Sequence, residues 1–151
     1  MGDKIICCRN VWDITDEVTG NSLVNGTIGY IQNLSFSELK YPLHGIPSVP
    51  IASCSLHTDS KDVFESLNID LSTLLTGKKT LTPEQEYRIS KGFKEPLEFN
   101  YGYAITCHRA QGSQWDKVLI LEENFPFNKE EHARWLYTAV TRAVDKAVII
   151  R

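Results

Sequence analysis

The sequence predicts an α/β protein with a parallel sheet in its C-terminal third and a smaller, β-rich part before it. Two apolar runs, YGYAITC (101–107) and KVLILEE (117–123), show little alternation, which is typical of strands covered on both faces. A helical pattern over 129–144 and a third apolar run, AVIIR (147–151), follow them. Strand, strand, helix and strand in this order predict a parallel sheet. Glycines among β-branched residues in 23–34 predict the bent strands of a small barrel.

The segments on either side of this predicted barrel are strands and loops. Residues 3–9 (DKIICCR) are predicted to form a short apolar strand, and the polar, turn-rich residues 10–22 predict a loop. Residues 35–58 contain three prolines and an alternating piece, VPIASCSLH, which predicts an edge strand.

Two helices are predicted next. Apolar residues in 60–75 recur at spacings of three and four, which predicts an amphipathic helix ending at Gly77. The residues of this pattern are Val63, Phe64, Leu67, Leu71, Leu74 and Leu75. Residues 82–90 predict a second helix, because Thr82 is suited to the N-cap and Pro83 to the first helical position.

The helix predicted over 129–144 has its own start signal. Asn128 with Glu131 three residues later resembles a capping box. The predicted apolar stripe consists of Ala133, Leu136, Tyr137, Val140, Ala143 and Val144. The tryptophans on or near these elements, Trp115 and Trp135, are predicted to be core residues rather than platforms on which bases stack.

Composition excludes several classes of protein. The chain has 151 residues and a net charge of −3, so global charge does not indicate nucleic-acid binding and any phosphate site must be local. No apolar run is long enough for a membrane span, and the N-terminus lacks a signal peptide. Four cysteines without a C-x-x-C pair predict reduced thiols and a cytoplasmic location: Cys7, Cys8, Cys54 and Cys107.

Polar residues follow the predicted strand that ends at Thr106. Ligands of open α/β sheets bind at the carboxyl ends of strands, where free backbone N–H groups attract anions. Thr106 is suited to cap the turn CHRAQGS, and Gly112 allows close approach of a ligand to the backbone. Three side-chain donors lie in the same turn: His108, Arg109 and Gln111. The turn is therefore a candidate anion site; the alternative is a capped turn whose polar groups satisfy one another.

The C-terminal helix carries a second candidate group. Thr138, Thr141 and Arg142 are spaced to share one helical face, and an arginine held on a packed helix is suited to bind phosphate. The alternative for Arg142 is a surface salt bridge.

A separate hypothesis, a small cysteine hydrolase using Cys107 and His108, is weak, because adjacent residues on a strand point to opposite faces.

Together, YAITCHRAQGSQWDKVLI (103–120) and WLYTAVTRA (135–143) resemble motifs V and VI of superfamily 1 helicases, especially the RecD-like and phage Dda-like branch. GDKIICCRN followed by VNGTIGYI is similar to the segment that leads into an SH3-like barrel in that family. The resemblance implies that 1–22 and 99–151 belong to a partial RecA-like (P-loop NTPase) second motor domain. It also implies that 23–98 form an inserted SH3-like barrel with a helical insertion.

The resemblance also implies roles for individual residues. The positions that match contacts to single-stranded DNA are Thr106, His108, Arg109 and Gln111. Those that match the nucleotide site are Gly112, Ser113, Gln114 and Arg142. Among them, Arg142 matches the arginine finger on the γ-phosphate, a catalytic role.

One motif of such a motor is missing from these residues. No G-x-x-x-x-G-K-[ST] phosphate loop occurs, and the nearest string, LTGKKT (75–80), has Lys79 where Ser or Thr must hold magnesium. ATP with Mg²⁺ is therefore expected in the parent protein, with no tightly bound cofactor on this chain and no ATP hydrolysis by it alone.

The expected partners are single-stranded DNA and the N-terminal RecA-like domain of the same protein, without a membrane. The alternative function is a standalone nucleic-acid-binding module without NTPase activity.

Overall fold

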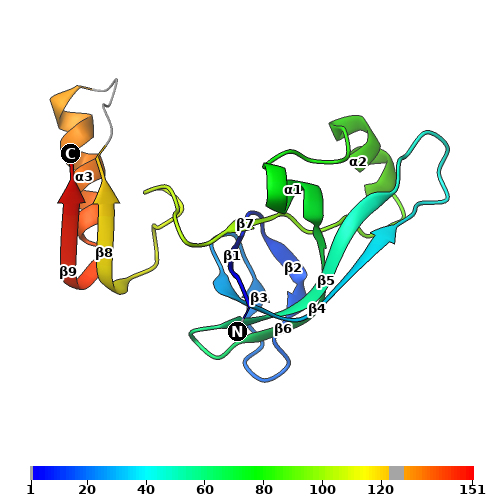
Figure 1. Cartoon of the computed structure of the whole chain (residues 1–151), viewed down its shortest axis with the longest axis horizontal. Coiled ribbons are helices and arrows are strands. Elements are labelled where there is room, and N and C mark those ends of the chain that lie inside the picture. The colour runs from blue at the N-terminus through cyan, green and yellow to red at the C-terminus, as the bar shows by residue number, and fades with distance from the viewer. Residues whose placement is uncertain (1, 123–127) are drawn as a thin grey trace. The chain divides into compact units, whose positions relative to one another are not determined.

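The computed structural model describes residues 2–122 and 128–151 and divides into two compact units, Met1–Tyr103 and Ala104–Arg151 (Figure 1). The protein is of the mixed α/β class, as predicted. Residues 1 and 123–127 lie outside the description. They include parts of the predicted motor-domain segments and the end of the strand predicted over 117–123.

The first unit is built on a five-stranded antiparallel sheet in the order β6-β5-β4-β1-β7 (Figure 1). Its strands are β1 (Lys4–Cys7), β4 (Ile28–Leu39), β5 (Val49–Thr58), β6 (Val63–Asp70) and β7 (Phe99–Tyr101). An isolated bridge between Ile69 and Leu97 joins the end of β6 to the segment just before β7. β1 pairs with β4 and β7, so residues 4–7 and 99–101, which were predicted to belong to the motor domain, lie in the sheet of the first unit.

All five strands contribute to one apolar core. Its fully buried side chains are Ile5, Cys7, Leu23, Leu56, Phe64, Leu67, Ile69 and Phe99. A second, smaller cluster lies at the far end of the β4–β5 hairpin, where it packs against α2 (Pro83–Ser90). Its buried members are Tyr41, Val49, Ile51, Leu81 and Ile89.

Residues 10–22, predicted as a loop, contain a short hairpin. Strands β2 (Val11–Thr15) and β3 (Ser22–Leu23) pair antiparallel, and a register shift separates their two residue pairs. Most polar residues of this segment are exposed, Asp16 excepted, and this polar pattern is why the sequence indicated a loop.

The turn of this hairpin is tied to the β5–β6 connection by two buried aspartates. Asp16 accepts hydrogen bonds from the backbone N–H groups of Val63 (2.8 Å), Thr19 and Val18, which lower the pKa of its carboxyl to about 2. Asp62 accepts a hydrogen bond from the Thr19 hydroxyl at 2.8 Å, and hydroxyl and amide donors lower the pKa of this carboxyl too. The two connections are therefore held together by carboxylates in their charged form.

The stability of the first unit is expected to fall as the pH drops from about 4 to about 2. Both carboxyls have a pKa below that of an unfolded-chain aspartate, about 3.9, so their contribution is complete above that pH and is lost as they become protonated. Urea unfolding at a series of pH values measures this, and Asp16→Asn is expected to flatten the dependence. The exposed neighbour Asp59 provides the control, Asp59→Asn. Parallel curves for wild type and Asp16→Asn would contradict the assignment.

The helix predicted over 60–75 is wrong for most of its length. Residues 63–70 form strand β6, and only α1 (Leu71–Thr76) is helical. Between the pairs Phe64–Leu56 and Leu67–Cys54, β6 has one residue more than β5, and Ser66 adopts a positive φ of 56°. This bulge turns both Phe64 and Leu67 inward at a spacing of three, which imitates a helical period.

The end of α1 and the start of α2 were predicted from the sequence, whereas the N-cap of α1 was not. Asp70 accepts hydrogen bonds from the first turn of α1, and Gly77 ends that helix in the left-handed conformation, with φ 69°. In α2, Thr82 forms a capping box with Gln85 and Pro83 occupies the first helical position, as predicted.

Strand β5 lies inside the sheet rather than at its edge, which corrects the prediction for 35–58. Two of the three prolines, Pro42 and Pro47, lie outside the strand. Pro50 pairs with β4 but lies beyond Ile51, where the pairing with β6 ends. Its missing N–H therefore removes no hydrogen bond to β6, and the interior strand tolerates it.

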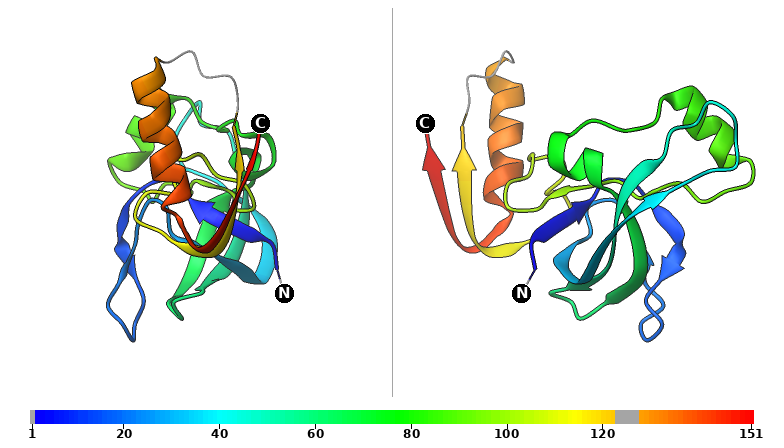
Figure 2. Two further views of the ribbon diagram at one scale, coloured as in Figure 1. Left: turned by 90° about the vertical axis from the view of Figure 1, so that its left-hand side faces the viewer. Right: turned by 45° about the vertical axis from the view of Figure 1, so that its right-hand side comes forward.

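The second unit contains β8 (Trp115–Leu121), α3 (Lys129–Val140) and β9 (Ala143–Ile150). The strands pair in parallel, as predicted, and α3 packs against the pair (Figure 2). The predicted strand over 101–107 is wrong, because β7 ends at Tyr101 and the following residues are not in a strand.

The predicted burial of this second sheet is also wrong. Leu119 and Leu121 are each 61% exposed, and most positions of β9 are exposed as well. On α3, Tyr137 is 73% exposed and Ala139 is the buried residue, so the predicted stripe does not describe the packed face. Within the described residues, these apolar side chains have too few neighbours to cover both faces of the sheet.

Candidate functional site

The turn that follows Thr106 has the capped geometry the sequence predicts. The Thr106 hydroxyl accepts a hydrogen bond from the Arg109 backbone N–H at 3.4 Å, and the Ala110 N–H donates to the Thr106 carbonyl at 3.1 Å. Gly112 has φ +87°, and a Cβ placed on it would meet no atom within 4 Å. The side chains of the predicted DNA-contacting residues are all exposed: Thr106, His108, Arg109 and Gln111. The turn therefore presents these side chains and open backbone to solvent.

Arg142 lies just after α3 and is half-buried. Its Nε donates to the Thr138 carbonyl (3.1 Å), its Nη1 to the Ser113 carbonyl (3.2 Å) and its Nη2 to the Thr141 hydroxyl (3.2 Å). These bonds use three of the five N–H groups of a guanidinium. None of the carboxylates that the structure describes forms an ion pair with Arg142, so the salt-bridge alternative is not observed there.

Two further hydrogen bonds hold the turn and the helix end together. The Gln114 side chain donates to the Thr141 carbonyl at 3.4 Å, and the Trp115 N–H donates to the Arg142 carbonyl at 2.9 Å. The structure thus places Ser113 and Gln114 next to Arg142. Along the chain, β8 and α3 separate Ser113 and Gln114 from Arg142. The parallel pairing of β8 with β9 brings the two segments together.

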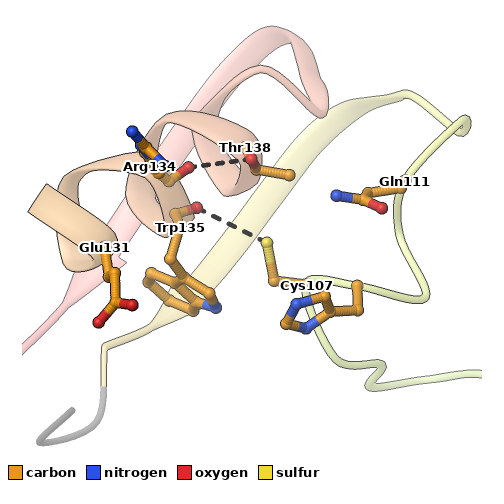
Figure 3. Close-up of a pocket in the computed structure, with 7 residues that line it drawn as sticks. Cys107, Gln111, Glu131, Arg134, Trp135 and Thr138 are labelled. Atoms are coloured by element: carbon orange, nitrogen blue, oxygen red, sulfur yellow. Dashed lines mark hydrogen bonds between the residues drawn. The ribbon is translucent and has the colours of Figure 1, made fainter. Parts of the chain in front are cut away.

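A pocket of about 320 Å³ opens beside this turn (Figure 3). It is lined by Cys107, His108, Gln111, Glu131, Arg134, Trp135 and Thr138. Three of these residues, Glu131, Arg134 and Trp135, were not predicted to belong to a site. The available signal was the spacing of Glu131, Trp135 and Thr138, which places them on one face of α3.

Trp135 and Cys107 meet at this pocket. Trp135 is only partly buried and forms part of the pocket wall. It is therefore not the fully enclosed core residue that was predicted. The Cys107 thiol points to the Trp135 carbonyl at 3.6 Å, and burial raises its pKa (Figure 3). A thiol held protonated is a poor nucleophile, and Cys107 and His108 lie in a turn rather than a strand. The geometry therefore gives no support to a cysteine hydrolase.

The structure shows neither a candidate metal site nor a candidate membrane helix in the part of the chain that it describes. Among the residues it describes, no three His, Cys, Asp or Glu side chains gather closely enough to hold a metal ion. Within the same part of the chain, no helix has the length and apolar character needed to cross a bilayer.

The C-terminal third of the chain is similar to known proteins. Residues 101–150 match the UvrD-like helicase C-terminal domain, so this region resembles that family. A segment of 54 residues, 34% of the chain, is 43% identical to the ATP-dependent RecD2 DNA helicase of Deinococcus radiodurans. A segment of 60 residues is 33% identical to an uncharacterized protein of Methanocaldococcus jannaschii. The matched segments span only 7% and 5% of the lengths of these two relatives.

Proposed function

We propose that this chain is the C-terminal part of the second motor domain of an ATP-dependent DNA helicase. The observation that carries the proposal is the position of Arg142, within the matched region, beside the turn 112–114. A helicase motor needs a fixed cation near the phosphate that is transferred, and an arginine braced by three hydrogen bonds is such a cation.

The residues of this site fit a bound nucleotide. Arg142 has two N–H groups that its observed hydrogen bonds do not use, and the space beside Gly112 is open. Arg142 would hold the terminal phosphate, while Ser113 and Gln114 would lie along the nucleotide. ATP supplies the free energy of phosphoanhydride hydrolysis that drives movement. Its magnesium ion would be held beside a phosphate loop elsewhere in the protein, because no G-x-x-x-x-G-K-[ST] occurs in these residues.

The exposed start of the turn is the proposed contact with single-stranded DNA. The Thr106 hydroxyl, the His108 ring and the Gln111 amide are polar groups that phosphate oxygens accept from, and Arg109 adds a positive charge. The partner completing the nucleotide site is an N-terminal RecA-like domain of the same protein. We assign the second unit to a RecA-like fold and the first unit, with its bridged five-stranded sheet, to an SH3-like barrel.

Salt-dependent binding of an oligothymidylate by the full-length protein tests the DNA contact. Arg109→Gln is expected to weaken binding and to reduce the slope of log K against log salt by about 0.7, the value for one phosphate contact on a single strand. Thr106→Val is expected to weaken binding with a smaller change in slope, because it removes a hydroxyl and no charge. Lys146→Gln on the exposed part of β9 is the charge-matched control. An unchanged slope for Arg109→Gln would show that this turn faces away from the strand.

The alternative, a standalone nucleic-acid-binding module, differs in one measurable property. It predicts strand binding without ATP hydrolysis in the full-length protein, whereas the proposed motor predicts hydrolysis stimulated by single-stranded DNA. The chain of 151 residues alone is expected to hydrolyse no ATP under either hypothesis, because it contains no phosphate loop.

A further inference from the structure

The pocket beside the turn that follows Thr106 has the size and the lining of a small-ligand site. A volume of about 320 Å³ is near the lower end of the ~300–1,000 Å³ typical of small-molecule pockets, so it suits a single ring system. Figure 3 shows the two sources of its wall: Trp135 and Glu131 project from α3, and Cys107 and Gln111 come from the turn. The lining combines an aromatic surface with hydrogen-bonding groups of both kinds.

The aromatic wall is held in position by its neighbours. The His132 ring stacks on the Trp135 ring, with centroids 6.3 Å apart and planes inclined by 12°. His132 is itself fixed by Glu122, whose carboxylate lies 2.7 Å from its Nε2 and also 2.7 Å from Arg151 Nε. A side chain braced in this way loses little conformational freedom when a flat ligand stacks on it.

The charges around the pocket favour a neutral ring over a phosphate. Arg134 is already paired with Glu130, one turn earlier on α3, at 2.5 Å. The Glu131 carboxylate forms part of the wall, where it repels an anion but accepts a hydrogen bond from an amino or imino group. Gln111 offers both a donor and an acceptor in the same wall.

We propose that this pocket is a nucleobase subsite, in which one base of the bound strand stacks against Trp135. The proposal rests on the proposed function, because the strand reaches the pocket through the phosphate contacts of the adjacent turn. His108 is both one of the proposed phosphate contacts of the turn and one of the residues that line the pocket. Glu131 and Gln111 would bond the edge of the base, and stacking on the indole accepts any base sequence.

Photocross-linking of the unmodified full-length protein tests the position of the base. An oligothymidylate carrying 5-iodouracil is bound and irradiated, and the cross-linked tryptic peptides are identified by mass spectrometry. The expected adduct is on WLYTAVTR (135–142), which carries Trp135, and not on AQGSQWDK (110–117), which carries Trp115. Adducts on other peptides alone, with the strand bound, would overturn the subsite. A protein that binds no strand would overturn the proposed function and the subsite with it.

Variants at Trp135 separate stacking from a purely structural role. Trp135→Ala is expected to lower the affinity of the full-length protein for an intact oligonucleotide by about 5- to 150-fold. Its affinity for an abasic strand of the same length is expected to be unchanged, and Trp135→Phe is expected to restore most of the loss. The control is Trp12→Ala, since Trp12 is an exposed tryptophan of the first unit. Equal losses on the intact and the abasic strand would show that Trp135 acts only on the fold.

Discussion

Replacing Arg142 by alanine is expected to reduce DNA-stimulated ATP turnover of the full-length protein by about 10³- to 10⁵-fold. The reason is that the guanidinium is the one cation held beside the turn 112–114 by hydrogen bonds that the structure describes. Affinity for single-stranded DNA is expected to change by less than about twofold, because Arg142 is half-buried at the helix end and is not among the exposed side chains of the turn. Steady-state hydrolysis and oligonucleotide titration measure the two effects.

Two controls separate catalysis from folding in this experiment. Lys129→Ala removes an exposed positive charge from the other end of α3 and is expected to leave turnover unchanged. Arg142→Lys keeps the charge but cannot reproduce the planar fork, so turnover is expected to remain low. If Arg142→Ala and the wild type turned over ATP equally, Arg142 would not be part of the nucleotide site. A parallel loss of DNA affinity and of the thermal transition would instead indicate that the arginine only holds the turn to the helix.

The second large effect is expected at Phe64, in the strand that the sequence pattern predicted as a helix. Phe64→Ala is expected to lower the free energy of unfolding of the first unit by about 3–5 kcal/mol, because the ring is almost completely buried in the main core. Phe36→Ala is the matched control: this ring is 66% exposed on β4, and its loss is expected to change stability by no more than about 0.5 kcal/mol. Urea unfolding followed by circular dichroism measures both. Similar changes for the two variants would place Phe64 outside the core.

The error at β6 shows what periodicity alone does not contain. The spacing of Phe64 and Leu67 fits a helix, and only the partner strand reveals that an extra residue lies between their two pairs. A bulge is a property of two strands. The partner strand here is β5, which the prolines of residues 35–58 had led us to predict as an edge strand. By contrast, three caps depend on residues within one turn of a helix and were predicted from the sequence: Gly77 at the end of α1, Thr82 at the start of α2 and Asn128 at the start of α3. The N-cap of α1, Asp70, was not predicted, because the helical pattern was taken to begin at residue 60.

The candidate site was predictable in part for the same reason. The Thr106 cap is local, and the proximity of Thr138, Thr141 and Arg142 follows from helical spacing. The bond from Arg142 to the Ser113 carbonyl, and the pocket between 107–111 and 131–138, join segments that are distant along the chain. Sequence patterns contain the chemistry of those side chains but not the pairing of β8 with β9 that brings them together.

The open faces of the β8–β9 pair have a consequence for how the molecule loses its structure. Among the described residues of the second unit, the buried apolar side chains are only Ala110, Ile120 and Ala139. Little apolar surface therefore opposes a partial opening of this unit, and its amide hydrogens should take up deuterium long before those in the centre of β5. On warming the chain of 151 residues, Arg142 and the capped turn would lose their alignment while the five-stranded sheet was still intact, so the second unit would unfold before the main melting transition.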